Sequence, residues 1–146
     1  MKIAFSAVIL SLTLPTFVAA QEAKSPLIGK WAMTVAKHND DEITKAPLIR
    51  NELVFDAETA TVTFDRPGMG GNDKMATGKY SYDGKSKPAR ISLKDFPSEL
   101  PTTVLVKVEG DRLTICYHSK CGDVPDDFKT AKNDGREIVE LARRKN

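Results

Sequence analysis

The sequence is poor in the residue types that carry chemistry. It has two histidines, His38 and His118, two cysteines and one tryptophan among 146 residues. Neither histidine stands in a recognised nucleophile or zinc motif, and the Gly-x-Ser-x-Gly and His-Glu-x-x-His patterns are absent. Catalysis near neutral pH usually needs a titratable group tuned by burial and held against a partner. We therefore expect no enzyme, no catalytic residues and no cofactor.

An excess of charge of one sign is also lacking. The 22 lysines and arginines face 20 acidic residues, and the net charge is +2 with the signs mixed along the chain. This balance gives no electrostatic reason to expect nucleic acid or an anionic membrane as a partner. The acidic stretches at 40–42 and 123–127 lack the alternating ligand spacing of a calcium loop, so they indicate solvated loops and no metal.

The one extended apolar run lies at the N-terminus. Lys2 precedes this run over 3–18, and Val18-Ala19-Ala20 supplies the small residues that signal peptidase requires. The run is too short for a membrane anchor and holds no cysteine that could be lipidated. We expect a signal peptide over 1–20, export to the periplasm or the medium, and no membrane span. Residues 21–26 would form a short tail before a single domain over 27–146.

A sustained helical period is missing as well, which leaves strands as the main element. Apolar and polar residues alternate in eight segments, centred on 31–35, 53–55, 62–64, 80–82, 91–93, 104–108, 113–117 and 139–141. Turn residues separate them, and short helical turns are expected only over 45–51 and 126–132. Eight meandering strands close most economically into an all-β, antiparallel up-and-down barrel, with an open sandwich of two four-stranded sheets as the alternative.

The first of these segments resembles a known barrel opening. Leu27-Ile28-Gly29-Lys30-Trp31 is similar to the Gly-x-Trp start of lipocalin-type barrels, in which the Trp closes the barrel floor and an Arg of the last strand stacks on it. The resemblance implies structural roles for Gly29, Trp31 and Arg143, with Arg144 as the rival arginine.

The chain more closely resembles the small secreted lipocalin-like domains of a planctomycete-type uncharacterised family. The most specific match is the segment Gly110 to Cys116, and the likeness covers nearly all of the chain after residue 20. Val124 departs from the Arg that the family usually has before Pro-x-x-Phe, and Cys121 is an added cysteine. The resemblance implies a lipocalin-like fold but no particular activity, because a shared fold does not license a function.

Cys116 and Cys121 are separated by four residues, Tyr117 to Lys120. An even cysteine count in an exported protein favours a disulfide, and so small a ring would stabilise the fold by roughly 2 kcal/mol. Free thiols and a metal site with His118 and Asp123 are the alternatives. The cysteine spacing is not an established zinc pattern, so we expect the disulfide.

The inward face of the strands is expected to be almost wholly apolar, with aromatic residues that either fill the core or line a ligand pocket. Strands of roughly five to seven residues favour a shallow or collapsed cavity. His38 is expected to be hydrated in an acidic loop, and His118 to be exposed on the outer face beside Thr114 and Cys116. The candidate ligand-binding residues are Phe55, Phe64, Tyr80, Tyr82 and Tyr117.

These observations predict an exported, monomeric, non-catalytic binding module whose open barrel end takes a small apolar ligand or a cell-envelope component. The alternatives are a protein that inhibits a hydrolase through its loops and a structural envelope protein. An apolar cavity open to solvent would favour a small ligand, whereas a filled barrel with an exposed apolar loop tip would favour a protein partner.

Overall fold

The computed structural model describes residues 25–39, 41–43, 52–59, 61–66, 74–96, 101–119 and 123–145. Within these ranges every regular element is a strand. In chain order they are β1 (Gly29–His38), β2 (Asp41–Ile43), β3 (Glu52–Asp56), β4 (Thr61–Arg66), β5 (Lys74–Asp83), β6 (Arg90–Lys94), β7 (Thr103–Glu109), β8 (Arg112–His118) and β9 (Arg136–Arg143). The expected signal peptide over 1–20 and the helical turn over 45–51 lie outside the described residues. The helical turn over 126–132 is wrong, because that segment forms bends and turns.

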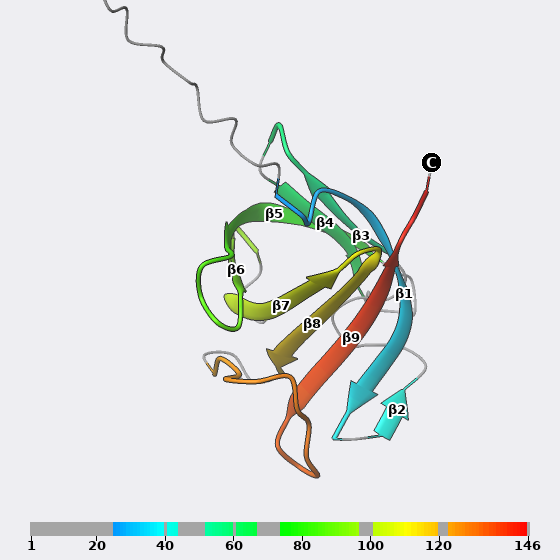
Figure 1. The fold of residues 1–146 in the computed structure, drawn as a ribbon, viewed down its shortest axis with the longest axis vertical. Coiled ribbons are helices and arrows are strands. Elements are labelled where there is room, and N and C mark those ends of the chain that lie inside the picture. The colour runs from blue at the N-terminus through cyan, green and yellow to red at the C-terminus, as the bar shows by residue number, and fades with distance from the viewer. Residues whose placement is uncertain are drawn as a thin grey trace, which may run out of the picture.

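Eight of these strands form a closed antiparallel barrel (Figure 1). Strands β3 to β9 pair in chain order, and β1 pairs with β3 along one edge and with β9 along the other, which closes the sheet on itself. Strand β2 is an addition that pairs with the last part of β1. The predicted eight-stranded up-and-down barrel is confirmed, and the open sandwich is wrong.

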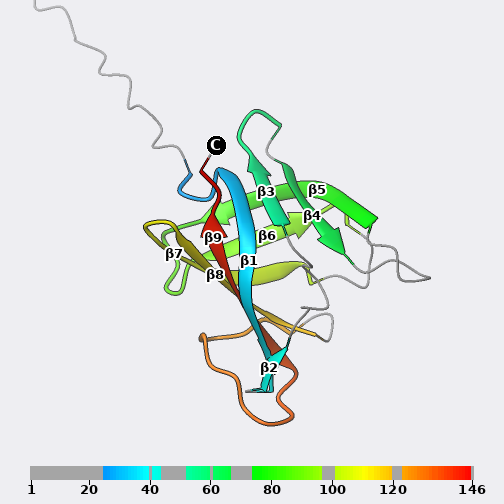
Figure 2. The same cartoon turned by 90° about the vertical axis from the view of Figure 1, so that its right-hand side faces the viewer.

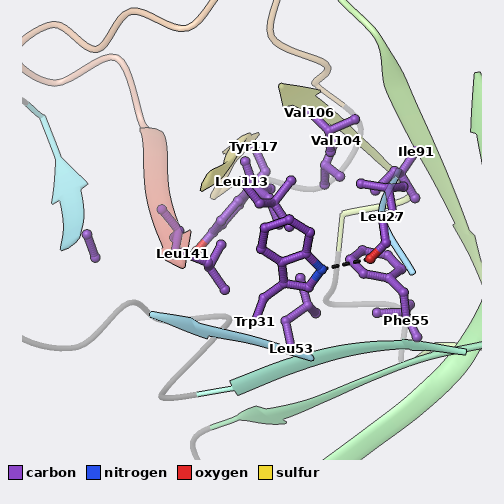
Figure 3. Close-up of a cluster of buried hydrophobic side chains, with 14 of the residues drawn as sticks. Leu27, Trp31, Leu53, Phe55, Ile91, Val104, Val106, Leu113, Tyr117 and Leu141 are labelled. Carbon is purple, nitrogen blue, oxygen red and sulfur yellow. Dashed lines mark hydrogen bonds between the residues drawn. The ribbon is translucent and has the colours of Figure 1, made fainter. Parts of the chain in front are cut away.

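The period-two alternation places one apolar set inside the barrel. Trp31 and Leu27 are fully buried in this core, which Figure 3 shows around the indole ring. The remaining buried members come from all eight barrel strands and are Ala36, Leu53, Phe55, Val62, Ala76, Ile91, Val104, Val106, Leu113, Ile115, Tyr117, Val139 and Leu141. Side chains therefore fill the interior, as expected for a barrel of eight strands.

A phenyl ring from a loop completes this filling. Asp95 has a positive φ of 62°, so the chain turns after β6 and Phe96 packs against the core. Gly78 makes room for the ring, because a Cβ at this position would clash with Phe96 and with the carbonyl of Lys94. The sequence pattern did not point to Phe96, since it follows the last alternating residue of β6.

A second buried group lies on the outer face of the sheet. Leu105 and Cys116 are directly paired on β7 and β8 and fully buried, yet they are not part of the barrel core. They are out of phase with their inward neighbours, so they point outward. The segment 123–135 runs beside them, and the charges of Asp126, Asp127 and Arg136 act on the Cys116 thiol.

The barrel has two unlike ends. At the first, called the Trp31 end here, lie the turn residues 57–59, 84–89 and 110–111. At the second, the His38 end, β1, β4, β6 and β8 finish and β5, β7 and β9 begin. His38 lies seven residues beyond Trp31 along β1, which is about 23 Å for an extended strand. In Figure 2, β1 and β9 run side by side between the two ends.

Candidate functional site

The Trp31 end is closed by an indole ring under a guanidinium group. Trp31 donates a hydrogen bond of 2.7 Å from Nε1 to the carbonyl of Leu27, so its one polar atom is satisfied inside the core (Figure 3). The Cζ of Arg143 lies 4.1 Å from the centroid of the ring. Arg144 instead points to the surface, where its Nη1 lies 3.3 Å from Glu52 Oε2. Arg143 is therefore the arginine that covers the indole.

Arg143 also fastens the segment before β1 to the end of β9. Its Nη1 donates to the carbonyl of Ile28 over 2.7 Å, and its Nη2 donates to the carbonyl of Pro26 over 2.9 Å. Gly29 adopts φ +121°, and a Cβ there would lie 3.2 Å from Arg143 Nη1. The structure thus explains why the Gly-x-Trp pattern has a glycine at this position. A side chain would strain the backbone and crowd the guanidinium group.

An open groove of about 790 Å³ lies at the same end of the barrel. The 84–89 loop forms one wall and β7 forms the other, with Arg143 and Pro26 at one end. We call it the Tyr82 groove. Its apolar lining comes from Tyr82, Pro88, Ala89, Val106, Val108 and Phe128.

The groove exists because β6 and β7 pair over a short length only. Their ladder runs from Ser92 opposite Thr103 to Arg90 opposite Leu105. One further bond joins Val106 N–H to the carbonyl of Ala89, after which the 84–88 loop leaves β7. The groove therefore lies between the 84–89 loop and the last part of β7, where Val106 and Val108 line it.

The 84–89 loop is held in shape by one carboxylate. Asp83 accepts the backbone N–H groups of Lys85 and Ser86 and the hydroxyl of Ser86, over distances of 2.5–3.2 Å. These bonds, the Ser86 hydroxyl first, hold the pKa of Asp83 below its ordinary value. The groove wall is thus organised before any ligand arrives.

The charged side chains in the lining are all cations. Lys87, Lys107 and Arg143 line the groove, and none of the described lining residues is acidic. Lys107 Nζ lies 2.9 Å from Glu109 Oε1, and Arg143 is occupied by the indole and two carbonyls. Lys87 has no ion-pair partner in the described part of the chain.

The five predicted ligand-binding residues do not gather in one pocket. Phe55 and Tyr80 meet edge to face in the barrel, with ring centroids 5.0 Å apart. Burial, followed by the nearby charge of Asp56, raises the pKa of Tyr80. Tyr117 is 2% exposed in the core, and the side chain of Phe64 lies outside the described part of the structure. Tyr82 alone of the described four lines the groove.

A buried polar cluster lies at the His38 end. Glu137 is 1% exposed and projects into the barrel between two neighbouring strands. Its Oε2 accepts a hydrogen bond of 2.5 Å from the Tyr117 hydroxyl on β8, and its Oε1 lies 3.4 Å from His38 Nδ1 on β1. Strand register places these three residues in one row.

Burial governs the ionisation of this cluster. It raises the pKa of Glu137, while the Tyr117 hydrogen bond and the nearby His38 act in the opposite direction with smaller effect. The cluster joins two titratable groups across β1 and β9, the pair of strands that closes the barrel.

The inward face is almost wholly apolar, in line with the expectation, and among the described residues its buried charged side chain is Glu137. The expected loop position of His38 is wrong, because His38 is the last residue of β1. The alternation of the sequence already indicated that Glu137 faces inward. Glu137 is in phase with the buried Val139 and Leu141.

The outer face differs from expectation at His118. Its side chain is only 14% exposed, with Nε2 4.0 Å from Asp123 Oδ2, so the expectation of an exposed histidine is wrong. Cys116 beside it is a free, buried thiol whose pKa burial raises to about 11. Because Cys116 is a free thiol in this structure, the expected Cys116–Cys121 disulfide is not formed, although Cys121 itself lies outside the described residues. Among the residues that the structure describes, no three potential ligands gather around a metal site.

Comparison of the chain with protein-family models, with the curated proteins and with the solved structures gives no match. None of the described segments is a helix with the length and hydropathy needed to cross a membrane. What the Tyr82 groove and the buried cluster can bind or do therefore has to follow from their own geometry.

Proposed function

We propose that this protein is an exported, monomeric, non-catalytic binding module that holds a small apolar ligand in the Tyr82 groove. The observation that carries the proposal is the groove itself, which is open to solvent, has apolar walls and measures about 790 Å³. This volume falls within the range of roughly 300–1,000 Å³ that small-molecule sites occupy. Export is inferred from the leader pattern over 1–20.

The groove is a better candidate than the barrel interior. Trp31 and Phe55 are buried in the core with the aliphatic side chains, and Phe96 packs against them, so the described interior is filled by side chains. A ligand that entered there would have to displace well-packed groups, at a cost of several kcal/mol. The groove needs no such displacement, because its walls are already separated.

A protein partner has less support. The large apolar side chains exposed in the described ranges are Met75 and Val124, which belong to β5 and to the 123–135 segment. Single exposed apolar residues are ordinary on soluble domains and do not make a docking patch. No described loop tip therefore resembles the apolar plug that a hydrolase inhibitor would need.

The test is a titration with decanol as a neutral apolar probe. Trp31 is the one tryptophan of the chain, and Arg143 both covers its ring and lines the groove. We expect a saturable change of tryptophan emission and a stoichiometry of one by calorimetry.

A matched pair of variants locates the probe. Phe128→Ser removes one apolar wall and should weaken decanol binding about tenfold, because it removes most of a phenyl contact. Val124→Ser is the control, since Val124 is exposed in the same segment and does not line the groove. Absence of saturable binding, or equal losses in both variants, would contradict the proposal.

A further inference from the structure

We infer that the ligand of the Tyr82 groove is a small amphipathic anion, with its apolar body against Tyr82 and Val108 and its one anionic group at Lys87. The inference rests on the proposed function, because it concerns the same groove. It adds the chemical class of the ligand and the residue that recognises its charge.

The first observation is the sign of the charges in the groove lining, beside which Glu109 and Asp111 lie near Lys107 and Arg143. The whole chain is nearly balanced, with 22 basic and 20 acidic residues. The described groove lining nevertheless contains three cations, Lys87, Lys107 and Arg143, and no carboxylate. A concave surface with cations and apolar walls favours an anion over a neutral or cationic molecule, since the apolar walls lower the local dielectric constant and strengthen the attraction.

The second observation separates the three cations by their engagement. Arg143 lies over Trp31 and donates to the carbonyls of Pro26 and Ile28. Lys107 is paired with Glu109. A ligand carboxylate at either cation would compete with an existing partner, whereas at Lys87 it would find an ammonium group without an ion-pair partner among the described residues.

The third observation is the position of Lys87 on a preorganised wall. Asp83 fixes the turn that precedes it, and Pro88 and Ala89 continue the wall beside it. Lys87 is exposed and also lines the groove, and a lysine in such a position can keep its ammonium group hydrated while its aliphatic stem contacts apolar surface. An amphipathic ligand would match this order, with its charged end at the rim and its apolar body between the walls.

The experiment compares decanoate with decanol, which share one chain length and differ in the charged end. Both are titrated by calorimetry at pH 7.5 and low salt, below the concentration at which decanoate forms micelles. We expect wild-type protein to bind decanoate about tenfold more tightly than decanol, because one charge-assisted contact supplies a difference of this size in affinity. Raising the salt to 0.5 M should reduce this preference, because the contact is at the rim.

Two variants assign the preference to its residue. Lys87→Gln should bind both probes equally, since the substitution removes the charge and keeps a polar side chain at the position. Lys85→Gln is the control, because Lys85 belongs to the same loop but does not line the groove, and it should keep the tenfold preference. Melting curves check that both variants fold.

Each outcome has a separate meaning. Equal binding of the two probes by the wild-type protein would overturn this inference and leave the proposed function intact. Binding of neither probe would overturn the proposed function itself. A decanoate preference that survives Lys87→Gln would overturn the assignment to Lys87.

Discussion

Strand β9 carries a charged side chain at each end, and β1 places a ring directly opposite each of them. At the Trp31 end Arg143 pairs with Trp31, and at the His38 end Glu137 pairs with His38. Both pairs lie on the seam that closes the barrel. Their environments differ, because the guanidinium side chain is 28% exposed and the carboxylate side chain is 2% exposed.

The difference shows how a cationic and an anionic side chain are stabilised at the two ends of one seam. A guanidinium is weakly hydrated and planar, so Arg143 can stack on an indole and reach two carbonyls while part of it stays in water. The carboxylate of Glu137 is buried away from water. It accepts a hydrogen bond from the Tyr117 hydroxyl and lies close to His38. At the His38 end the seam therefore holds a buried carboxyl group, and burial raises the pKa of that group.

The strongest way to break the Trp31 end is Trp31→Ala. The substitution removes a fully buried indole from the centre of the core and leaves Arg143 without its ring. Large core truncations of this kind cost about 3–5 kcal/mol. We expect the loss in urea denaturation followed by circular dichroism, and a variant that melts like the wild type would contradict the closed floor.

The matching change at the His38 end is Glu137→Ala. It removes the buried carboxylate that accepts the hydrogen bond of the Tyr117 hydroxyl and opens a small cavity, and such changes cost about 2–3 kcal/mol. Glu140→Ala on the same strand is the control, since Glu140 is out of phase with the buried row. Its unfolding free energy should stay within about 0.5 kcal/mol of the wild type. Equal losses in the two variants would mean that the buried cluster contributes nothing specific.

The sequence made the Trp31 end far easier to predict than the His38 end. The alternation placed the strands, because one face of every strand is buried, and the Gly-x-Trp pattern pointed to the ring and its arginine. Glu137 was missed because its partners are not visible in the sequence. Tyr117 and His38 lie beside Glu137 only through the register of β8, β9 and β1. The Tyr82 groove was missed because it depends on where the β6–β7 ladder stops, which no local pattern encodes.

A milder substitution separates Arg143 from its neighbour. Arg143→Met removes the cation over the indole and two hydrogen bonds to carbonyls, and should lower the unfolding free energy by about 1–2 kcal/mol. Arg144→Met removes a surface pair with Glu52, where such pairs contribute about 0–1 kcal/mol. Thermal melts of the two variants measure this difference. A larger loss of stability in Arg144→Met than in Arg143→Met would contradict the assignment of Arg143 as the arginine that covers Trp31.

The smallest expected effect is the pH dependence of the unfolding free energy, which should have opposite signs at the two ends of the barrel. The folded protein raises the pKa of Glu137 above the ordinary 4.5, chiefly by burial. The stability that its neutral form contributes is then fully present below pH 4.5 and is lost as the pH rises through the raised value. Glu137→Gln keeps a neutral side chain that accepts the Tyr117 hydrogen bond at every pH. We therefore expect the wild type to lose stability relative to Glu137→Gln as the pH increases from 4.5 to 8.

Asp56, the last residue of β3 at the Trp31 end, should show the opposite trend. The Thr59 backbone N–H, followed by the Thr59 hydroxyl, lowers the pKa of Asp56 below 3.8. Its contribution is present above that pH and is lost as the pH falls through the lowered value, so the wild type should lose its advantage over Asp56→Asn on acidification. Urea denaturation of both variants and the wild type from pH 3 to 8 measures the two slopes. Slopes of the same sign would show that the two ends do not respond to protons in opposite ways.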